Sequence, residues 1–192
     1  MAHAPSFRRP RELGPAPDDG RRGLLHRAAT IGAVAGFGGF VWWRVTDLPG
    51  PKRLPSIGYP LIDGRRLETV SLLGGPVLVN FWATSCAPCV AEMPELAEVY
   101  RAYRPRGLEL IAVAMPYDRP DHVLQFASSR ALPFPVALDP TGDAVRAWGG
   151  IEGTPSTWLA GPTGRIERFW LGTPDFTDLR RTVERLLTAR PA

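Results

Sequence analysis

Uninterrupted apolar runs and helix-forming segments follow one another along the second two thirds of the chain. The apolar runs have the length of buried strands and lie at residues 76–82, 108–115 and 134–138. Helices are predicted at residues 88–103, 121–129, 143–148 and 178–188. In the last of these helices, one apolar stripe fits packing on a core and consists of Leu179, Val183, Leu186 and Leu187.

Two pairs of shorter apolar segments predict hairpins. The first pair is residues 61–64 and 67–72, and the second is residues 156–159 and 166–171, which flank a Gly-Pro-Thr-Gly turn. Strands that alternate with helices, followed by a hairpin and a helix, predict an α/β sandwich with a mixed sheet. The chain of 192 residues is long enough for one such domain, at residues 57–192, and a smaller extra segment.

That extra segment is an uncharged stretch of 16 residues at 28–43, bounded by arginines. As a helix it would be about 24 Å long, slightly short of a hydrocarbon core of roughly 30 Å. Leu24 and Leu25 can extend it, and the tryptophans at its far end suit a membrane interface. Arginines dominate residues 1–27, so the positive-inside rule leaves that tail in the cytoplasm. We therefore predict a single transmembrane anchor.

Three other interpretations of this segment stay open. It could be a cleaved signal peptide, although no clean small-x-small cleavage site follows Trp43. The Arg21-Arg22 pair resembles a twin-arginine export signal, and a buried soluble helix is the third alternative. Residues 44–56 are predicted to be a linker because four of them are proline or glycine. Anchor or export would place the domain outside the cytoplasm, where disulfides persist.

The distribution of charge argues against a nucleic-acid partner. Residues 1–56 hold 9 lysines and arginines against 4 acidic residues, whereas residues 57–192 hold 14 against 15. The basic character of the chain therefore belongs to its N-terminal part. A domain that binds nucleic acid would carry the positive charge itself.

The only two cysteines of the chain stand three residues apart in the sequence Cys86-Ala87-Pro88-Cys89. A zinc site needs about four ligands, and the chain has no second cysteine pair and only three histidines, His3, His26 and His122. A purely structural disulfide would close a very short loop and constrain the unfolded chain little. A redox-active dithiol is the interpretation that explains the spacing.

The predicted secondary structure gives the two thiols different roles. Cys86 follows a strand and begins a helix, where free amides and the helix dipole stabilise a thiolate, so it is the predicted attacking thiol. Pro88 is tolerated in the first helical turn. The step of three residues places Cys89 on the same helix face, where it can resolve a mixed disulfide as the buried partner.

The sequence VNFWATSCAPCVAEMP, residues 79–94, resembles the active site of the TlpA/ResA-type membrane-anchored thioredoxins. Residues 153–157, Gly-Thr-Pro-Ser-Thr, occupy the place of that family's cis-proline loop, and the insertion around residues 118–135 is similar to theirs. The resemblance implies a thioredoxin fold with an N-terminal hairpin extension and a central insertion, preceded by one transmembrane helix. It also implies a protein-disulfide reductase on the periplasmic side of the bacterial inner membrane.

The resemblance also implies partners. Members of the family receive electrons from a membrane thiol transporter and serve cytochrome c maturation or the assembly of copper centres. Apocytochrome c or respiratory oxidase assembly factors are therefore the implied clients. No cofactor and no metal ion are expected.

Site residues follow from the same resemblance. The Thr154–Pro155 bond should be cis and lie against the dithiol, where the Thr154 backbone could pair with a client chain. Glu92 matches a family glutamate and would accept a proton from Cys89 or modulate its pKa. This role matters because Asn80 replaces the buried aspartate of cytoplasmic thioredoxins. The predicted substrate-binding residues are Trp82, Ser85, Ala87, Pro88, Thr154 and Pro155.

Two of these substrate-binding assignments carry a qualification. Trp82 is interpreted as core packing first and as a flank of the active site second. Ser85 departs from the family, which usually has tryptophan before the first cysteine, and a smaller polar side chain would alter the docking surface.

Two functions from other classes stay open at this point. A copper-handling assembly factor would bind metal through the two sulfurs, but copper-delivering relatives pair a wider cysteine spacing with a later histidine, and no histidine follows His122. A peroxiredoxin-like peroxidase would share the central insertion, but the Pro-x-x-x-Thr-x-x-Cys pattern is missing.

Overall fold

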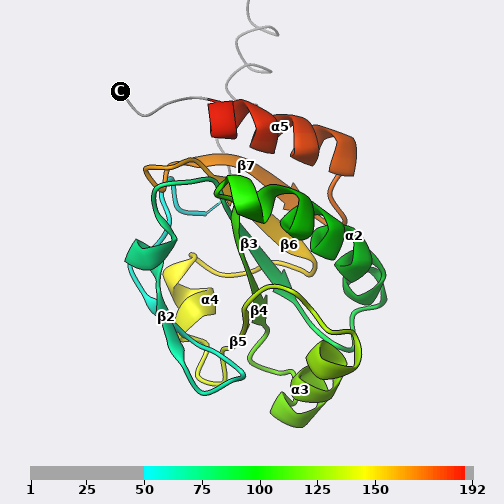
Figure 1. The fold of residues 1–192 in the computed structure, drawn as a ribbon. Coiled ribbons are helices and arrows are strands. Elements are labelled where there is room, and N and C mark those ends of the chain that lie inside the picture. The colour runs from blue at the N-terminus through cyan, green and yellow to red at the C-terminus, as the bar shows by residue number, and fades with distance from the viewer. Residues whose placement is uncertain (1–49, 189–192) are drawn as a thin grey trace, which may run out of the picture. The chain divides into compact units, whose positions relative to one another are not determined.

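A computed structural model describes residues 50–188 of the chain. Its central sheet has five strands in the order β5-β4-β3-β6-β7. The strands are β3 (Val77–Trp82), β4 (Glu109–Ala114), β5 (Val136–Leu138), β6 (Ser156–Ala160) and β7 (Ile166–Leu171). The first three are parallel, while β6 runs antiparallel to β3 and β7 antiparallel to β6. The predicted mixed sheet is confirmed (Figure 1).

The four helices lie close to their predicted positions. They are α2 (Ala87–Tyr103), α3 (Pro120–Ser129), α4 (Asp143–Ala147) and α5 (Phe176–Thr188). The buried positions of α5 include Leu179, Val183 and Leu186, so the apolar stripe packs as predicted. The predicted tail at 1–27 and the predicted anchor at 28–43 lie outside the described residues. Within residues 50–188, no helix is long and apolar enough to cross a bilayer.

The first hairpin differs from its prediction. Its strands are β1 (Gly58–Pro60) and β2 (Arg66–Glu68), and residues 61–65 form the turn between them. Residues 69–72, expected to continue the second strand, form a 3-10 helix instead. The apolar residues of both segments suggest strand because they need burial, but a turn and a short helix bury Leu61 and Leu72 equally well.

The domain also begins earlier than expected. The Leu54 N–H donates to the Gly164 carbonyl at 2.8 Å, and the Ile166 N–H donates to the Lys52 carbonyl at 3.0 Å. Residues 52–54, predicted as linker, therefore pair with the β6–β7 hairpin.

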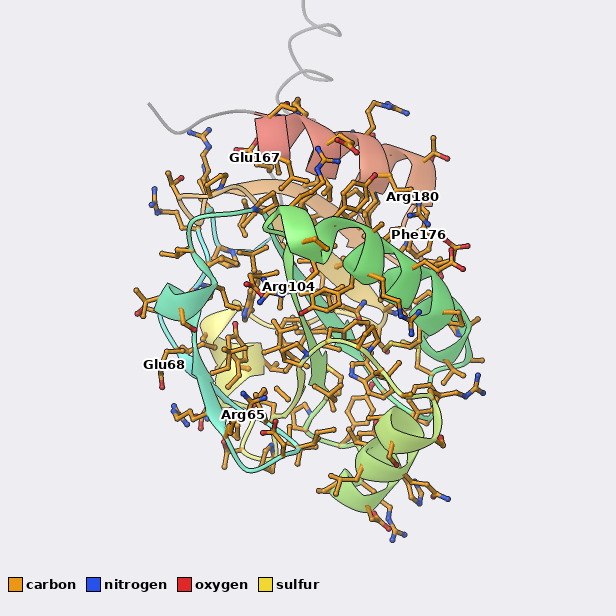
Figure 2. The ribbon with its side chains drawn as sticks, viewed as in Figure 1. Arg65, Glu68, Arg104, Glu167, Phe176 and Arg180 are labelled. Carbon is orange, nitrogen blue, oxygen red and sulfur yellow. A yellow bond between two sulfur atoms is a disulfide. The ribbon has the colours of Figure 1, made fainter. Side chains whose placement is uncertain are left out.

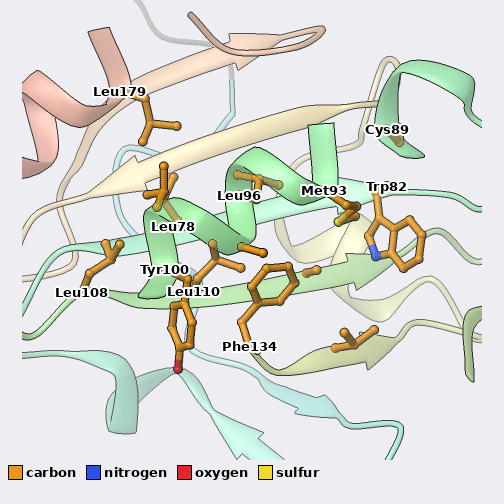
Figure 3. Packing of buried hydrophobic residues seen from close by; sticks show 14 of the residues in the cluster. Leu78, Trp82, Cys89, Met93, Leu96, Tyr100, Leu108, Leu110, Phe134 and Leu179 are labelled. Carbon is orange, nitrogen blue, oxygen red and sulfur yellow. The ribbon is translucent and has the colours of Figure 1, made fainter. Parts of the chain in front are cut away.

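Alternation along β3 divides the core into two clusters. Leu78 and Trp82 face the cluster that includes side chains of α2, α3 and α5 (Figure 3). Val77, Val79 and Phe81 face the opposite cluster, which includes side chains of the first hairpin and α4. Because side chains alternate between the two faces of a strand, Asn80 lies on the same face as Leu78 and Trp82, toward α2. This register sets a polar side chain beneath the helix that carries the cysteines.

Charged side chains cover the outside of the domain (Figure 2). Arg180 of α5 pairs with Glu95 of α2 at 2.9 Å, and Arg106 pairs with Glu184 at 2.7 Å. Each such exposed pair contributes only about 0–1 kcal/mol, whereas burial of one large apolar side chain contributes about 1.5–3 kcal/mol. The two apolar clusters therefore hold the site in place.

Candidate active site

Cys86 and Cys89 form a disulfide at the junction of β3 and α2, with 5.2 Å between their Cα atoms. Cys86 is the N-cap residue of α2, and the Cys89 N–H donates to the Cys86 sulfur at 3.3 Å. The first amides of a helix have no partner inside the helix and can stabilise negative charge. The position therefore favours a thiolate on Cys86 in the reduced protein.

The two cysteines differ in their access to solvent. Cys89 is fully buried, whereas Cys86 is partly exposed. Ser85, Ala87 and Pro88 are all exposed around Cys86, which is the arrangement that a docking partner needs. The prediction that Cys89 is the buried partner is confirmed.

The loop before β6 lies against the disulfide. The Thr154–Pro155 peptide bond is cis, as predicted. The Thr154 carbonyl oxygen lies 3.5 Å from the Cys86 sulfur, and Pro155 is buried. The Pro155 carbonyl accepts a hydrogen bond of 2.8 Å from the Gly172 N–H, which ties this loop to the end of β7.

Trp82 does not belong to the docking surface. Its side chain has no exposed area, and its ring packs on Phe126 of α3 with 5.1 Å between the centroids. The assignment of Trp82 as a substrate-binding residue was therefore wrong, and its interpretation as core packing is confirmed. The physical reason is strand parity, because Trp82 points to the same buried face as Leu78.

A buried polar group joins α2 to the sheet beneath the disulfide. The Asn80 side-chain amide donates to Glu92 Oε1 at 2.8 Å and to the Thr157 hydroxyl at 2.9 Å. Asn80 is fully buried and Glu92 is 2% exposed, so Glu92 is not a solvated surface residue. Asn80 Oδ1 and Glu92 Oε2 are buried without a hydrogen-bond partner among the described residues.

Burial raises the pKa of Glu92 from 4.5 to about 7, because the charged form loses its hydration. The hydrogen bond from the Asn80 amide and the nearby Thr173 side chain favour the carboxylate and limit this rise. A group of this pKa exchanges its proton near neutral pH. Glu92 stands three residues after Cys89 on α2, which is one helical turn.

Asp118 joins the site, although its role was not predicted. Its carboxylate accepts hydrogen bonds from the backbone N–H and the hydroxyl of Thr84, both at 2.6 Å. Thr84 lies two residues before Cys86. A prediction could have started from the order of the strands. Asp118 follows β4 and Thr84 follows β3, and because these strands are parallel neighbours, both residues lie at the same end of the sheet.

The arrangement can exchange electrons through its two sulfurs. Among residues 50–188, no group of three or more histidine, cysteine or acidic side chains could hold a metal ion. The reachable sulfur, the buried sulfur and a nearby proton acceptor are the parts that thiol–disulfide exchange needs.

Known proteins match both the sequence and the fold. The model of the AhpC/TSA family matches residues 52–169. The thiol-disulfide oxidoreductase ResA of Bacillus cereus is 34% identical over 149 residues, covering 74% of this chain and 84% of the relative. ResA of Geobacillus thermodenitrificans is 31% identical over 123 residues, covering 64% of this chain and 70% of the relative. A thiol:disulfide interchange protein of Chlorobium tepidum has a similar structure, with a TM-score of 0.65 and 26% identity. The match covers 74% of this chain and 99% of that protein.

Proposed function

The chain belongs to the AhpC/TSA family and is a thiol–disulfide oxidoreductase, and we propose that it reduces disulfides of client proteins. The observation that carries this proposal is the partly exposed residue Cys86 at the N-terminus of α2, whose sulfur lies beside the Thr154 carbonyl. A client chain that lies along the loop at Thr154 would bring its disulfide to this sulfur. The buried Cys89 then completes the exchange.

The reaction proceeds in two substitutions at sulfur. The Cys86 thiolate attacks one sulfur of the client disulfide, forms a mixed disulfide and releases the other client sulfur as a thiolate. Cys89 then loses its proton to the Glu92 carboxylate and attacks the Cys86 sulfur, which releases the second client thiolate. The client gains two electrons, and the Cys86–Cys89 disulfide seen in the structure is the product.

The surroundings of Cys86 support reduction as the direction. A strong oxidant is one whose reduced form is stabilised. Pro88 has no N–H, so it removes one possible donor from the loop between the cysteines. In the described part of the chain, the Cys89 N–H is the donor at the Cys86 sulfur. The helix N-terminus stabilises the Cys86 thiolate, but with one donor fewer than a loop without proline would offer, so the reduced form gains less stabilisation than in such a loop, which favours a lower potential.

The equilibrium of the full-length chain with glutathione tests this direction. We expect a reduction potential at or below about −270 mV, the value of thioredoxin. Quantifying the reduced and oxidised forms at fixed glutathione ratios measures it. A value near −120 mV, that of a strong oxidant, would reverse the proposed direction.

Replacing Glu92 by glutamine should slow client reduction by about 100-fold, at the low end of general-base effects. Glutamine has the shape of the protonated acid and keeps an oxygen for the Asn80 amide, so the fold is retained. The rate of the unmodified protein should rise with pH through about 7 as Glu92 ionises, and the variant should lack this rise. Initial rates between pH 5 and 9 measure both effects.

The same substitution has an expected effect on stability. Because the pKa of Glu92 is raised on folding, the folded state binds more protons than the unfolded state between pH 4.5 and about 7. Stability therefore falls over this range as pH rises, and the substitution Glu92→Gln should remove that loss. Glu95→Gln on the exposed side of α2 is the matched control. If the free energy of unfolding depended on pH in the same way in the Glu92→Gln variant and in the unmodified chain, the role of Glu92 would be contradicted.

Location and partners belong to the same proposal. We infer that residues 28–43 anchor the chain in the bacterial inner membrane and that the domain faces the periplasm. The uncharged length of that segment and the arginines before it support this inference. A membrane thiol transporter would return electrons to Cys86 and Cys89, and apocytochrome c or oxidase assembly factors would be the clients.

A further inference from the structure

The turn that delivers Cys86 to the start of α2 is held from outside by one carboxylate. Thr84 Oγ donates to Asp118 Oδ1 and the Thr84 N–H donates to Asp118 Oδ2, each at 2.6 Å. Hydrogen bonds to an ionised acceptor are shorter and roughly twice as strong as those between neutral groups. Both oxygens of Asp118 are therefore engaged with a residue two positions before the attacking sulfur.

Few other hydrogen bonds fix this turn, although Ala83 is buried in the core. The Cys86 N–H donates to the Ala83 carbonyl at 3.1 Å, which closes the turn on itself. Apart from Asp118, no side chain of residues 50–188 forms a hydrogen bond with residues 83–85. Ser85, where the family usually has tryptophan, is exposed. The position of Cys86 relative to Cys89 thus depends on the Asp118 contact more than it would if a large buried side chain stood at position 85.

Asp118 is itself held in a defined place. It follows β4, and the Met115 N–H donates to the Trp82 carbonyl at 2.9 Å, which joins the ends of the two strands. The Asp118 N–H then donates to the Met115 carbonyl at 2.9 Å, and the Arg119 N–H donates to Asp118 Oδ1 at 3.0 Å. These contacts orient the Asp118 carboxylate independently of its hydrogen bonds with Thr84.

We propose that Asp118 is a positioning residue for the dithiol. By fixing Thr84 through two hydrogen bonds, it holds the Cys86 sulfur against Cys89 and raises the effective concentration of one thiol toward the other. A higher effective concentration favours the disulfide over the dithiol. The proposal rests on the function proposed for the two cysteines and adds the residue that sets their geometry.

The substitution D118N separates position from charge. Asparagine can accept from the Thr84 N–H through its oxygen and donate to the Thr84 hydroxyl through its amide, so it keeps both contacts with Thr84 without the charge, and it loses only the bond from the Arg119 N–H. D118A removes both contacts and the charge together. T84A removes the hydroxyl contact alone, and T84S restores it.

The readout is the equilibrium constant of each full-length variant with glutathione. We expect D118A to lower the stability of the disulfide about tenfold, which corresponds to about 30 mV. The equilibrium constants of D118N and T84S should stay within about threefold of that of the unmodified chain. The constant of T84A should lie between theirs and that of D118A. D121A is the matched control, because the Asp121 carboxylate on α3 accepts hydrogen bonds from Arg119 instead of from the turn.

Two results would overturn the role of Asp118. Equal shifts in D118A and D118N would show that its charge, and not its position, acts on the dithiol. Equal values for T84A and T84S would show that the hydroxyl contact has no effect, and this comparison holds even if D118A fails to fold. The absolute potential of the unmodified chain tests the direction of the reaction, whereas the ratios between variants test Asp118.

Discussion

Replacing Cys86 by serine is expected to abolish client reduction, with a loss on the order of 10⁴-fold or more. Exchange starts when a thiolate attacks a disulfide sulfur, and Cys86 is the partly exposed cysteine of the pair, whereas Cys89 is buried. Serine has nearly the same size but a hydroxyl that stays protonated at neutral pH, so no comparable nucleophile remains. Reduction of a disulfide-bonded test protein by the chemically reduced variant measures the loss.

Stability serves as the control for this experiment. The disulfide closes a loop between residues only three apart, so its removal should change the free energy of unfolding little. Ser128→Ala, a small change at an exposed position of α3, is the matched variant outside the site. Activity in the Cys86→Ser variant above that of small thiols alone would show that Cys89 can attack clients and that burial does not separate the two roles.

The roles of the cysteines could be predicted because they depend on neighbours in the sequence. The apolar run before Cys86 and the helix after it fix where the sulfur stands relative to the first free amides. Pro88 fits that first turn, and the spacing to Cys89 sets the same helix face. Contacts between residues a few positions apart follow from the local secondary structure, and the pattern of apolar and polar residues predicts that structure.

The rest of the site could not be predicted because it joins residues far apart in the chain. Asn80 meets Thr157 across 77 positions and Thr84 meets Asp118 across 34. Such contacts depend on which strands become neighbours, and one sequence gives no direct signal for them. The resemblance to known thioredoxins supplied Glu92 and Pro155, whereas Asp118 needed the structure.

Parity along β3 explains both a success and an error. Asn80 and Trp82 stand two positions apart, so they face the same side of the sheet. Placing Asn80 at the position of a buried aspartate therefore implies that Trp82 is buried under the same layer. The assignment of Trp82 to the docking surface contradicted that register. The first hairpin was misplaced for a different reason, because its segments are too short for a periodic pattern.

Replacing Cys89 by serine should trap the chain in covalent complexes with its clients. Cys86 can still attack a client disulfide, but no second thiol remains to attack the mixed disulfide, which then decays only by external thiols. Cells that produce the full-length variant should accumulate adducts that run at high mass without reductant and collapse to the monomer with dithiothreitol. Mass spectrometry of the released partners would identify the clients.

The double variant Cys86→Ser with Cys89→Ser is the control, since it has no attacking sulfur and should form no adducts. Adducts in the membrane fraction are expected if residues 28–43 form an anchor, and soluble adducts would rule out that anchor. If the Cys86→Ser variant formed adducts and the Cys89→Ser variant did not, Cys89 would be the attacking thiol and Cys86 the resolving thiol. That reversal would require the buried Cys89 to become exposed on reduction, because a sulfur without accessible surface cannot meet a client disulfide.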